Sequence, residues 1–498
     1  MSKSIIYRLN NSLILTSFEL NRVSDTHRYF CIKQKNLVKM KVKFISVLIL
    51  VLTVCGFTTA NAQSVEDTLK EKVSELNDRI AGLEERAATS ETDLSKLTKI
   101  KFSGYIQSEF IMNENKASYP GNYFQIRRAR LKLTYEAADG IKFVVQPDFS
   151  SNTFSIKDAY VVLNDKWTKT FSLWAGKFNR PNYEVEYSSS QREVPERSNI
   201  IKALYPGERA IGFKLEAKPQ NLPLKVQLAL FNGNDGGFNQ FTDTTGKTSS
   251  SVIDNKDYDN FKDVMVRATY SFKFGNFGGL DFGAHAYFGQ LKSSATATLS
   301  SDYKTTSTVN IGDAVNRNWF GAEFQLFGDV LGGFSLKGEY IAGKNVMLGG
   351  SKFKDGSVLP NFQNNFAGYY LYLIKNIGTH NQFAFRYDYY DPNTDITGTD
   401  VKVVKYNGDA VNKIGKYTSS KFDLAYSTFT FAWHHYFDDN IRITLAYSII
   451  QNEKVGKDAT GKSNLTETYT NPDGTTGVND YSTVFKQNLL TLRLQAKF

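Results

Sequence analysis

The sequence is poor in cysteine and histidine, and each shortage excludes a kind of chemistry. Only two cysteines occur, Cys31 and Cys55, and both lie near the N-terminus. The rest of the chain therefore has no disulfide and no cysteine-bound metal. Among the five histidines, His434 and His435 are adjacent, and adjacent strand residues face opposite ways, so they cannot chelate one metal from one face. His285 has no marked serine partner for a hydrolase triad. We expect no cofactor, no metal site and no enzymatic activity.

Long apolar runs are also missing, and the mean hydropathy is −0.37, which excludes a helical membrane protein. The one apolar run, Phe44–Phe57, is too short for a spanning helix. Two lysines precede it and an A-x-A site ends at Ala62, as in a signal peptide. We predict a signal peptide at residues 40–62 with cleavage before Gln63. Residues 1–39 lack signal character, and our hypothesis is that they are a non-structural upstream extension.

A strong excess of one charge is absent once this segment is removed. The whole chain carries a formal charge of +10. Residues 1–62 hold nine of the basic residues and two of the acidic ones, which leaves 51 basic and 48 acidic residues in the rest. The remainder is nearly neutral, so the basic balance gives no reason to expect a nucleic-acid partner.

Residues 64–99 contain an apolar residue every three or four positions. The stripe comprises Leu69, Val73, Leu76, Ile80, Leu83, Ala87, Ser90 (a lapse), Leu94 and Leu97. The narrow stripe between charged flanks predicts a coiled-coil helix of about four heptads. The alternative is one amphipathic helix packed on the rest of the protein. β-branched residues at one heptad position favour a coiled coil of two helices, whereas a trimeric barrel would impose three helices. The pattern leaves both open.

Residues 101–498 are rich in aromatic residues and alternate between apolar and polar positions, as strands do. The predicted fold class is all-β, a sixteen-stranded antiparallel transmembrane β-barrel with a short N-terminal coiled-coil helix. Spanning barrel strands need about 9–11 residues. The predicted strands are 101–112, 122–135, 141–149, 155–164, 170–178, 210–218, 224–232, 262–273, 279–291, 315–327, 333–343, 364–376, 381–390, 424–437, 440–450 and 483–498.

From the fifth predicted strand onward, the connections alternate in length. Short turns such as 218–223 and 438–439 alternate with long polar loops such as 233–261 and 451–482. Outer-membrane barrels combine short periplasmic turns with long external loops, and a soluble sandwich has no reason to lengthen every second connection. The location we expect is the outer membrane of a Gram-negative bacterium.

The strand faces agree with a barrel that has lipid outside and water inside. In the last strand Leu490, Leu492 and Leu494 oppose Thr491, Arg493 and Gln495. A charged side chain facing lipid would cost about 2–4 kcal/mol, so the charges should face the lumen. The chain ends in Phe498 on the apolar face of that strand, and this C-terminus resembles the signal read by the barrel assembly machinery. The expected partners are this machinery and outer-membrane lipid.

The segment 178–209 interrupts the strand pattern. It holds five basic and five acidic residues and comes directly after the fifth predicted strand. Irregular loops of this length in compact proteins are usually functional or disordered. We predict that it folds into the lumen as a constriction loop.

The second predicted strand carries the most distinctive set of cations. Arg128, Arg130 and Lys132 lie on one face, where they form a basic ladder that would attract anions. The alternative is that inward cations merely pair with inward acids such as Asp148. Other cations expected to face inward are Lys142, Lys177, Lys214, Arg267, Arg317, Lys337, Arg386, Arg442 and Arg493.

Five short motifs follow one another along the chain. They are Phe124-Gln125-Ile126-Arg127-Arg128-Ala129-Arg130, Asp158-Ala159-Tyr160, Gly176-Lys177-Phe178-Asn179-Arg180-Pro181, Glu196-Arg197-Ser198 and Arg386-Tyr387-Asp388-Tyr389-Tyr390-Asp391-Pro392. In this order they resemble the phosphate-selective porin O and P family. The resemblance implies a sixteen-stranded homotrimeric porin whose third external loop folds inward, and whose arginines and lysines bind phosphate near the constriction.

The resemblance also implies roles for particular residues. Arg128, Arg130 and Lys177 match by motif, whereas Arg180, Arg192 and Arg197 match by lying in the loop. The equal numbers of acids and bases in the loop depart from a strongly cationic constriction. They favour a mixed-charge filter that screens by size.

Three hypotheses follow for function. The first is a porin for passive diffusion of small anionic or polar solutes, phosphate among them. The pore-lining set would be Arg128, Arg130, Lys132, Lys177, Arg180, Arg192, Arg197, Arg267 and Arg386. The second is a structural or adhesive barrel with a closed lumen that displays its external loops. The third is a barrel hydrolase that depends on His285.

Overall fold

The structure is a computed structural model of the whole chain. It describes residues 62–115, 120–150, 154–233, 239–242, 248–251, 257, 259–329, 332–350, 358–401, 421–471, 474–484 and 486–498. The chain divides into two compact units, residues 1–99 and 100–498. The predicted upstream extension, and the signal peptide up to residue 61, lie outside the described residues.

The described part of the first unit is one long helix, α3 (Ala62–Thr98). The predicted helix is therefore present, and Ala62 and Gln63 are its first two residues. Six apolar stripe residues of α3 are exposed in the single chain: Leu69, Val73, Leu76, Ile80, Leu83 and Leu94. A coiled coil formed by this stripe stays a prediction. Among the described residues, no helix is both long enough and apolar enough to cross a membrane.

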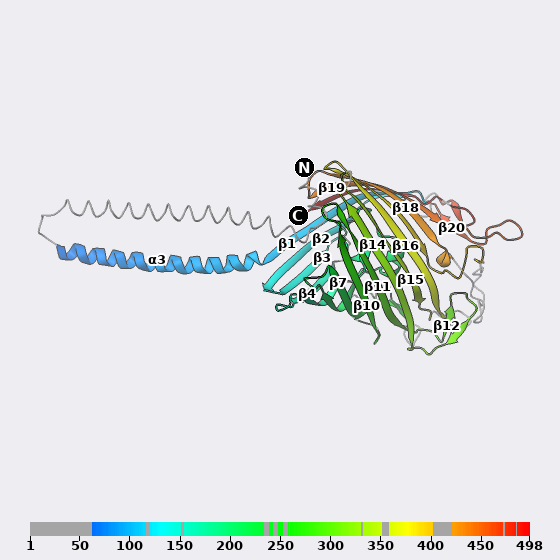
Figure 1. The fold of residues 1–498 in the computed structure, drawn as a ribbon, viewed down its shortest axis with the longest axis horizontal. Helices are drawn as coiled ribbons and strands as arrows, with labels where there is room; N and C mark the ends of the chain where they lie inside the picture. The colour runs from blue at the N-terminus through cyan, green and yellow to red at the C-terminus, as the bar shows by residue number, and fades with distance from the viewer. Residues whose placement is uncertain are drawn as a thin grey trace. The chain divides into compact units, whose positions relative to one another are not determined.

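The second unit is a closed antiparallel barrel (Figure 1). Its wall consists of β1 (Ile100–Asn113), β2 (Asn122–Ala138), β3 (Ile141–Asp148), β4 (Ser155–Asn164), β5 (Phe171–Asn179), β6 (Arg209–Ala217), β7 (Leu224–Asn232), β10 (Lys262–Lys273), β11 (Gly278–Lys292), β14 (Ala314–Gly328), β15 (Phe334–Met347), β16 (Asn361–Ile377), β17 (Asn381–Asp391), β18 (Tyr426–Tyr436), β19 (Ile441–Asn452) and β22 (Leu489–Lys497). All sixteen predicted strands are confirmed.

The remaining strands form hairpins within the long connections. They are β8 (Asn239–Thr242) with β9 (Thr248–Ser251), β12 (Ala297–Ser300) with β13 (Thr306–Thr308), and β20 (Thr466–Thr470) with β21 (Thr476–Asp480). The β12–β13 hairpin adds to the wall because β12 pairs in parallel with β16. The main sheet therefore counts eighteen strands, of which sixteen form the barrel.

The barrel closes between its first and last strands. β1 pairs with both β2 and β22, and β22 pairs with β19. β22 begins at Leu489 instead of the predicted 483. Tyr481, which precedes this segment, packs with Val401, Leu424 and Val455 in a cluster of the external loops. Closure leaves no edge strand whose backbone groups would lack partners in lipid.

The C-terminal residue takes part in this closure. The backbone N–H of Phe498 donates to the Gly104 carbonyl at 3.0 Å, and Gly104 returns the bond at 3.0 Å. The Phe498 ring occupies the place of a side chain at position 104, since a Cβ there would lie 2.6 Å from it. Phe498 is 68% exposed on the apolar outer face, as the sequence predicted.

The two faces of the wall differ as predicted. Large apolar side chains such as Phe102, Ile106, Phe213 and Leu492 are exposed on the outside, whereas buried charged and amide side chains face the interior. In β22, for example, Arg493 and Gln495 are buried while Leu492 and Leu494 are exposed. This is the polarity of a barrel with lipid outside and water inside.

Candidate pore and its inner loop

Residues 180–208, called the inner loop below, connect β5 to β6. The antiparallel ladder continues to the pairs Phe178–Ala210 and Asn179–Arg209, so the irregular segment is slightly shorter than the predicted 178–209. It contains two short helices, α4 (Tyr183–Glu186) and α5 (Asn199–Leu204). The Asn182 side chain caps α4 by accepting a hydrogen bond from the Val185 N–H at 3.4 Å.

The inner loop packs its apolar side chains against one side of the barrel interior. Val185, Val194, Ile200, Ile201 and Leu204 are buried with wall residues in one hydrophobic cluster. The wall contributes mainly aromatic residues, including Phe231, Tyr287, Trp319, Phe366 and Tyr370. The Trp319 indole N–H donates to the Tyr205 hydroxyl at 2.7 Å. Burial of these side chains supplies the hydrophobic free energy that holds the loop inside the barrel.

The acids of the inner loop are engaged by basic and polar side chains. Lys337 Nζ lies 2.8 Å from the Glu193 carboxylate, and Arg127 Nε lies 3.0 Å from that of Glu196. Glu186 contacts Lys225 at 3.3 Å and also pairs with Arg267, while Glu184 accepts from the Tyr372 hydroxyl at 2.8 Å. Glu208 pairs with Arg197 and Arg209. The loop carboxylates therefore offset much of the positive charge on this side.

The tip of the inner loop reaches the opposite part of the wall. The Tyr105 hydroxyl lies 2.6 Å from Ser189 Oγ, and an Arg130 guanidinium N–H donates to the same oxygen at 3.0 Å. The Gln495 amide donates to the Ser190 carbonyl at 3.1 Å. The loop thus crosses the interior from the aromatic side to β1, β2 and β22.

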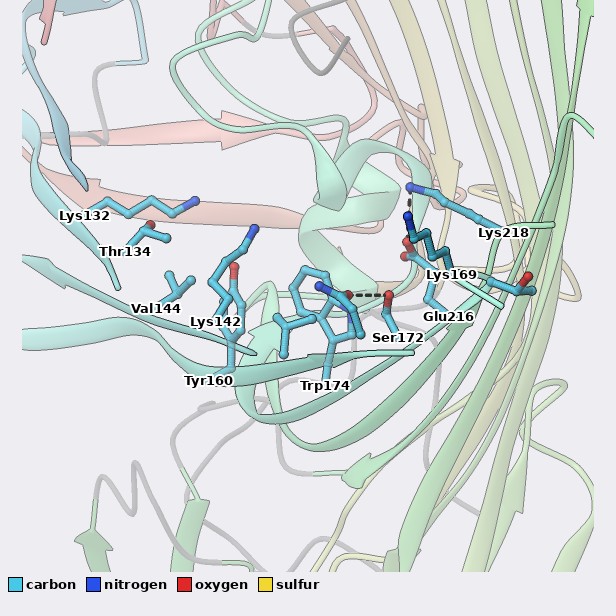
Figure 2. A pocket seen from close by; sticks show the side chains of 13 residues that line it. Lys132, Thr134, Lys142, Val144, Tyr160, Lys169, Ser172, Trp174, Glu216 and Lys218 are labelled. Carbon is cyan, nitrogen blue, oxygen red and sulfur yellow. Dashed lines mark hydrogen bonds and ion pairs between the residues drawn. The ribbon is translucent and has the colours of Figure 1, made fainter. Parts of the chain in front are cut away.

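Open space remains beside β1 to β6. One cavity of about 580 Å³ is lined by these strands and by loop residues such as Ser188, Ser190 and Gln191. A second cavity, of about 300 Å³, lies along the same strands near the short turns, and Figure 2 shows several lysine side chains around it. Lys132 and Lys218 line both cavities.

The lining of the two cavities is mostly basic. The larger has six basic side chains, Arg130, Lys132, Arg209, Lys214, Lys218 and Lys497, against the three acids Asp158, Glu186 and Glu216. The smaller has Lys132, Lys142, Lys169 and Lys218 against Glu216. Lys218 and Glu216 form an ion pair of 3.2 Å. The open part of the lumen therefore carries an excess of positive charge.

The three predicted ladder residues have different surroundings. Lys132 lines both cavities, and Arg130 lines the larger one while pairing with Asp148 at 2.8 Å. Arg128 is buried and donates to the Gln107 side chain at 2.9 Å, and its Nε has no partner among the described residues. The predicted alternative, in which inward cations pair with inward acids, thus holds for Arg130.

The structure places Lys177 on the outer face of β5, which removes it from the predicted pore-lining set. Its strand neighbours of the same parity, Phe171 and Leu173, are exposed, whereas Trp174 and Phe178 face inward. Lys214 occupies the inward position here, with its Nζ 3.9 Å from the centre of the Trp174 ring. The alternation of exposed and inward-facing residues along β5 indicates the outward orientation of Lys177.

The other predicted cations lie on the packed side of the interior. Arg180 is fully buried above the Tyr205 and Phe231 rings, at 5.6 and 5.5 Å. Arg267 pairs with Glu323 at 2.5 Å, and Arg386 pairs with Asp388 at 2.9 Å. These residues are buried, and they do not line the cavities described above.

Arg192 is also buried on this side, and its guanidinium forms no ion pair within 4.0 Å among the residues that the structure describes. None of its three guanidinium nitrogens has a hydrogen-bond partner among the described residues. Burial lowers the pKa of the Arg192 guanidinium, while the charges of Glu196 and Glu184 oppose this. Burial lowers the pKa of the Arg197 guanidinium, and the positive charge of Arg192 lowers it further. An uncompensated guanidinium group such as that of Arg192 attracts anions.

Arg127 is a residue that the sequence reasoning missed. Strict alternation would place it opposite Arg128, toward lipid. The β1–β2 register shifts between Gln107 and Ser108, and this bulge allows Arg127 to reach Glu196 in the inner loop. β-Bulges redirect side chains in this way.

A closed barrel with an apolar outer face, a charged interior and an inner loop is the architecture of an outer-membrane porin, located in the outer membrane of a Gram-negative bacterium. Residues 100–344 match the model of the family described as phosphate-selective porin O and P, which confirms the resemblance carried by the sequence motifs. No curated protein sequence matches it.

Several solved structures are similar to this chain. The anion-selective porin from Comamonas acidovorans is 12% identical with a TM-score of 0.47, and the match covers 80% of this chain and 99% of that one. The outer-membrane channel DcaP of Acinetobacter baumannii is 13% identical, with a TM-score of 0.44 and coverage of 80% and 97%. OmpT of Vibrio cholerae in its trimer form is 10% identical, with a TM-score of 0.45 and coverage of 80% and 99%.

Proposed function

We propose that the barrel conducts small anions and polar solutes by passive diffusion along the wall formed by β2 to β6. The observation that carries this proposal is the basic lining of the cavities beside these strands. Positive charge in a narrow passage raises the local concentration of anions and replaces part of their hydration. The inner loop fills the other side of the lumen, and its tip sets the size limit.

The inner loop does not cancel this selectivity, although it holds as many acids as bases. Its carboxylates pair largely with wall cations such as Lys337 and Arg127, away from the passage. Glu186 is the loop acid that also lines the larger cavity. This distribution supports anion selection over the size-only filter that the loop composition suggests.

We propose that phosphate binds at the Arg192 guanidinium during its passage. It follows Gln191, which lines the larger cavity, and it lies within electrostatic range of Arg128 and Arg197. A phosphate group between these guanidinium groups would accept charge-assisted hydrogen bonds that are otherwise unmade. We expect Arg192→Ala to weaken phosphate inhibition of chloride current at least about tenfold, a loss of about 1.4 kcal/mol of binding. Unchanged inhibition would exclude Arg192 from the site.

The conduction pathway is tested by charge reversal in planar bilayers. Lys132→Glu changes a residue that lines both cavities, so the reversal potential in a KCl gradient should shift toward cation selectivity. Lys262→Gln is the matched control, because Lys262 is exposed, pairs with Asp257 at 2.6 Å and lies outside both cavities. Equal reversal potentials for wild type and Lys132→Glu would refute the pathway. The adhesive alternative predicts a closed lumen and therefore no discrete conductance.

We also propose that the porin is a homotrimer whose α3 helices associate. The apolar stripe of α3 supports this, since Leu69, Val73 and Ile80 are at least half exposed in the single chain and would be covered in a coiled coil. Mass photometry in detergent should give three chains per particle. Replacing Leu76 and Leu83 by Asp should weaken α3 association in the intact protein, and an unchanged cross-linking pattern between α3 helices would contradict the coiled coil.

A further inference from the structure

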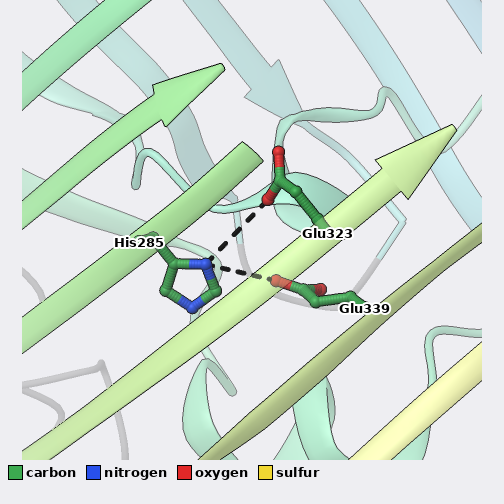
Figure 3. A group of neighbouring side chains, drawn as sticks. All are labelled: His285, Glu323 and Glu339. Carbon is green, nitrogen blue, oxygen red and sulfur yellow. Dashed lines mark ion pairs between the residues drawn. The ribbon is translucent and has the colours of Figure 1, made fainter. Parts of the chain in front are cut away.

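Three ionisable side chains meet inside the barrel, away from the cavities of the proposed pathway. His285 lies on β11, Glu323 on β14 and Glu339 on β15, which are neighbouring strands. His285 Nδ1 is 3.6 Å from Glu339 Oε1 and 3.9 Å from Glu323 Oε2 (Figure 3). One potential ligand atom from each residue lies within 4.8 Å of the other two.

The polar atoms of this cluster are buried and incompletely bonded. The side chains of His285, Glu323 and Glu339 are 0%, 3% and 0% exposed. Neither ring nitrogen of His285 has a hydrogen-bond partner among the described residues, and Glu323 Oε2 also lacks one. Buried polar atoms are nearly always bonded, so these atoms are available to bind a ligand.

A second buried histidine shows the ordinary arrangement. His434 is fully buried in β18. Its Nδ1 lies 2.8 Å from the Thr444 hydroxyl, and its Nε2 lies 2.6 Å from the Glu193 carbonyl. Both of its nitrogens are satisfied by the protein, which makes His434 a matched control for His285.

Other side chains hold the two carboxylates in place. Tyr370 donates to Glu339 Oε2 at 2.6 Å, and Asn182 of the inner loop donates to Oε1 at 3.1 Å. Arg267 binds Glu323 Oε1 at 2.5 Å, which leaves Oε2 directed toward the imidazole. Hydrogen bonds of this kind orient metal ligands in proteins.

Gly321 provides the space for the imidazole. It pairs with His285 across the β11–β14 ladder, and a Cβ at position 321 would lie 2.2 Å from the His285 ring. The ring can occupy its position facing the two carboxylates because position 321 has no side chain. The cluster is therefore accommodated by the backbone as well as by its polar neighbours.

We propose that His285, Glu323 and Glu339 bind a divalent transition-metal cation of the zinc type. One imidazole nitrogen and two carboxylate oxygens form a donor set that Zn²⁺ accepts at about 2.0–2.2 Å, with water as the fourth ligand. Ligand atoms in such a site are about 3.3 Å apart, closer than the 3.6 and 3.9 Å that separate His285 Nδ1 from the two carboxylates here. The ion would link three adjacent strands and, through Asn182, the start of the inner loop. This site is independent of the proposed conduction pathway.

The test measures metal content after refolding, because the ligands are buried in the finished barrel. Full-length protein is refolded into detergent with Zn²⁺ alone, desalted against a weak chelator and analysed by elemental mass spectrometry. We expect one Zn²⁺ per wild-type chain, at least a tenfold loss of occupancy in His285→Gln, and full occupancy in His434→Gln. His435→Gln tests adventitious binding by the His380–His435 pair, whose rings lie 6.3 Å apart. This variant should also retain Zn²⁺.

A spectroscopic readout covers the case in which His285→Gln fails to fold. Wild-type protein refolded with Co²⁺ should show the visible absorption of a tetrahedral site, and this spectrum should shift in Glu339→Gln. Zn²⁺ should also raise the thermal midpoint of wild type and leave that of Glu339→Gln unchanged. Wild-type protein that folds but retains no metal, or Zn²⁺ retention equal in wild type and Glu339→Gln, would overturn the proposal.

Discussion

At the scale of the residue, Arg127 shows how a charge can reveal a break in strand periodicity. Alternation would place Arg127 against lipid, at a cost of about 2–4 kcal/mol near the midplane. The bulge opposite Gln107 and Ser108 avoids this cost, and Arg127 reaches Glu196. Two consecutive arginines in a barrel strand thus carry a sequence signal for a bulge, which simple alternation overlooks.

Removal of one buried cation should destabilise the barrel strongly. Lys337→Met deletes the partner of Glu193, in a pair whose side chains are 6% and 19% exposed. We expect a loss of about 3–5 kcal/mol in the free energy of unfolding, because the Glu193 carboxylate stays mostly buried without its counter-ion. Denaturant titration in lipid vesicles measures this.

The control for this substitution is Lys421→Met. Lys421 pairs with Glu467 at 2.5 Å, but both side chains are more than a third exposed. A pair of this kind contributes about 1 kcal/mol or less. Similar losses for the two variants would contradict the importance of Lys337 in holding the inner loop.

The acid stability of the inner loop depends on Glu186. Burial disfavours its ionised form, but the charges of Arg267 and Lys225 outweigh this effect and lower the pKa to about 2 from 4.5. A lowered carboxylate pKa contributes stability that is present above the ordinary pKa and is lost as pH falls through the folded-state value.

The thermal midpoints of wild type and Glu186→Gln should therefore differ by a constant amount above about pH 5. The difference should shrink below that pH and vanish only near pH 2. Thermal scans across this range in detergent provide the measurement. Loss of the whole difference by about pH 4 would mean that Glu186 titrates as an ordinary carboxylate.

At the scale of the element, the inner loop divides the lumen into a packed side and an open side. Its apolar residues join the aromatic cluster around Trp319, whereas its serine-rich tip faces the larger cavity. The position of the loop could be predicted from the sequence, because strand alternation stops there. Its pairing could not, because partners such as Glu193 and Lys337 are 144 residues apart.

Deletion of Ser188–Arg192 should enlarge the passage. Ser188, Ser190 and Gln191 line the larger cavity, and Ser189 connects the tip to Tyr105 and Arg130. We expect the single-channel conductance to rise by roughly twofold, since resistance falls as a narrow section widens. Conductance equal to that of wild type would show that current does not pass the loop tip.

At the scale of the whole molecule, the sequence determines the barrel more completely than the site. A two-residue period marks sixteen strands because each strand faces lipid on one side and water on the other. The roles of Arg267 and Arg386 depend on contacts with Glu323 and Asp388 inside the folded lumen. The orientation of Lys177 was predictable from β5 alone, but a motif match does not report which face a residue occupies.

The reversal potential of the wild-type channel shows whether the basic wall along β2 to β6 controls the passage. Purified protein in a neutral planar bilayer, under a tenfold KCl gradient, should give a reversal potential of the sign expected for a chloride-selective channel. Added phosphate should reduce the chloride current. A potential of the sign set by potassium would contradict this prediction, because the lysines and arginines along β2 to β6 would then not control the passage.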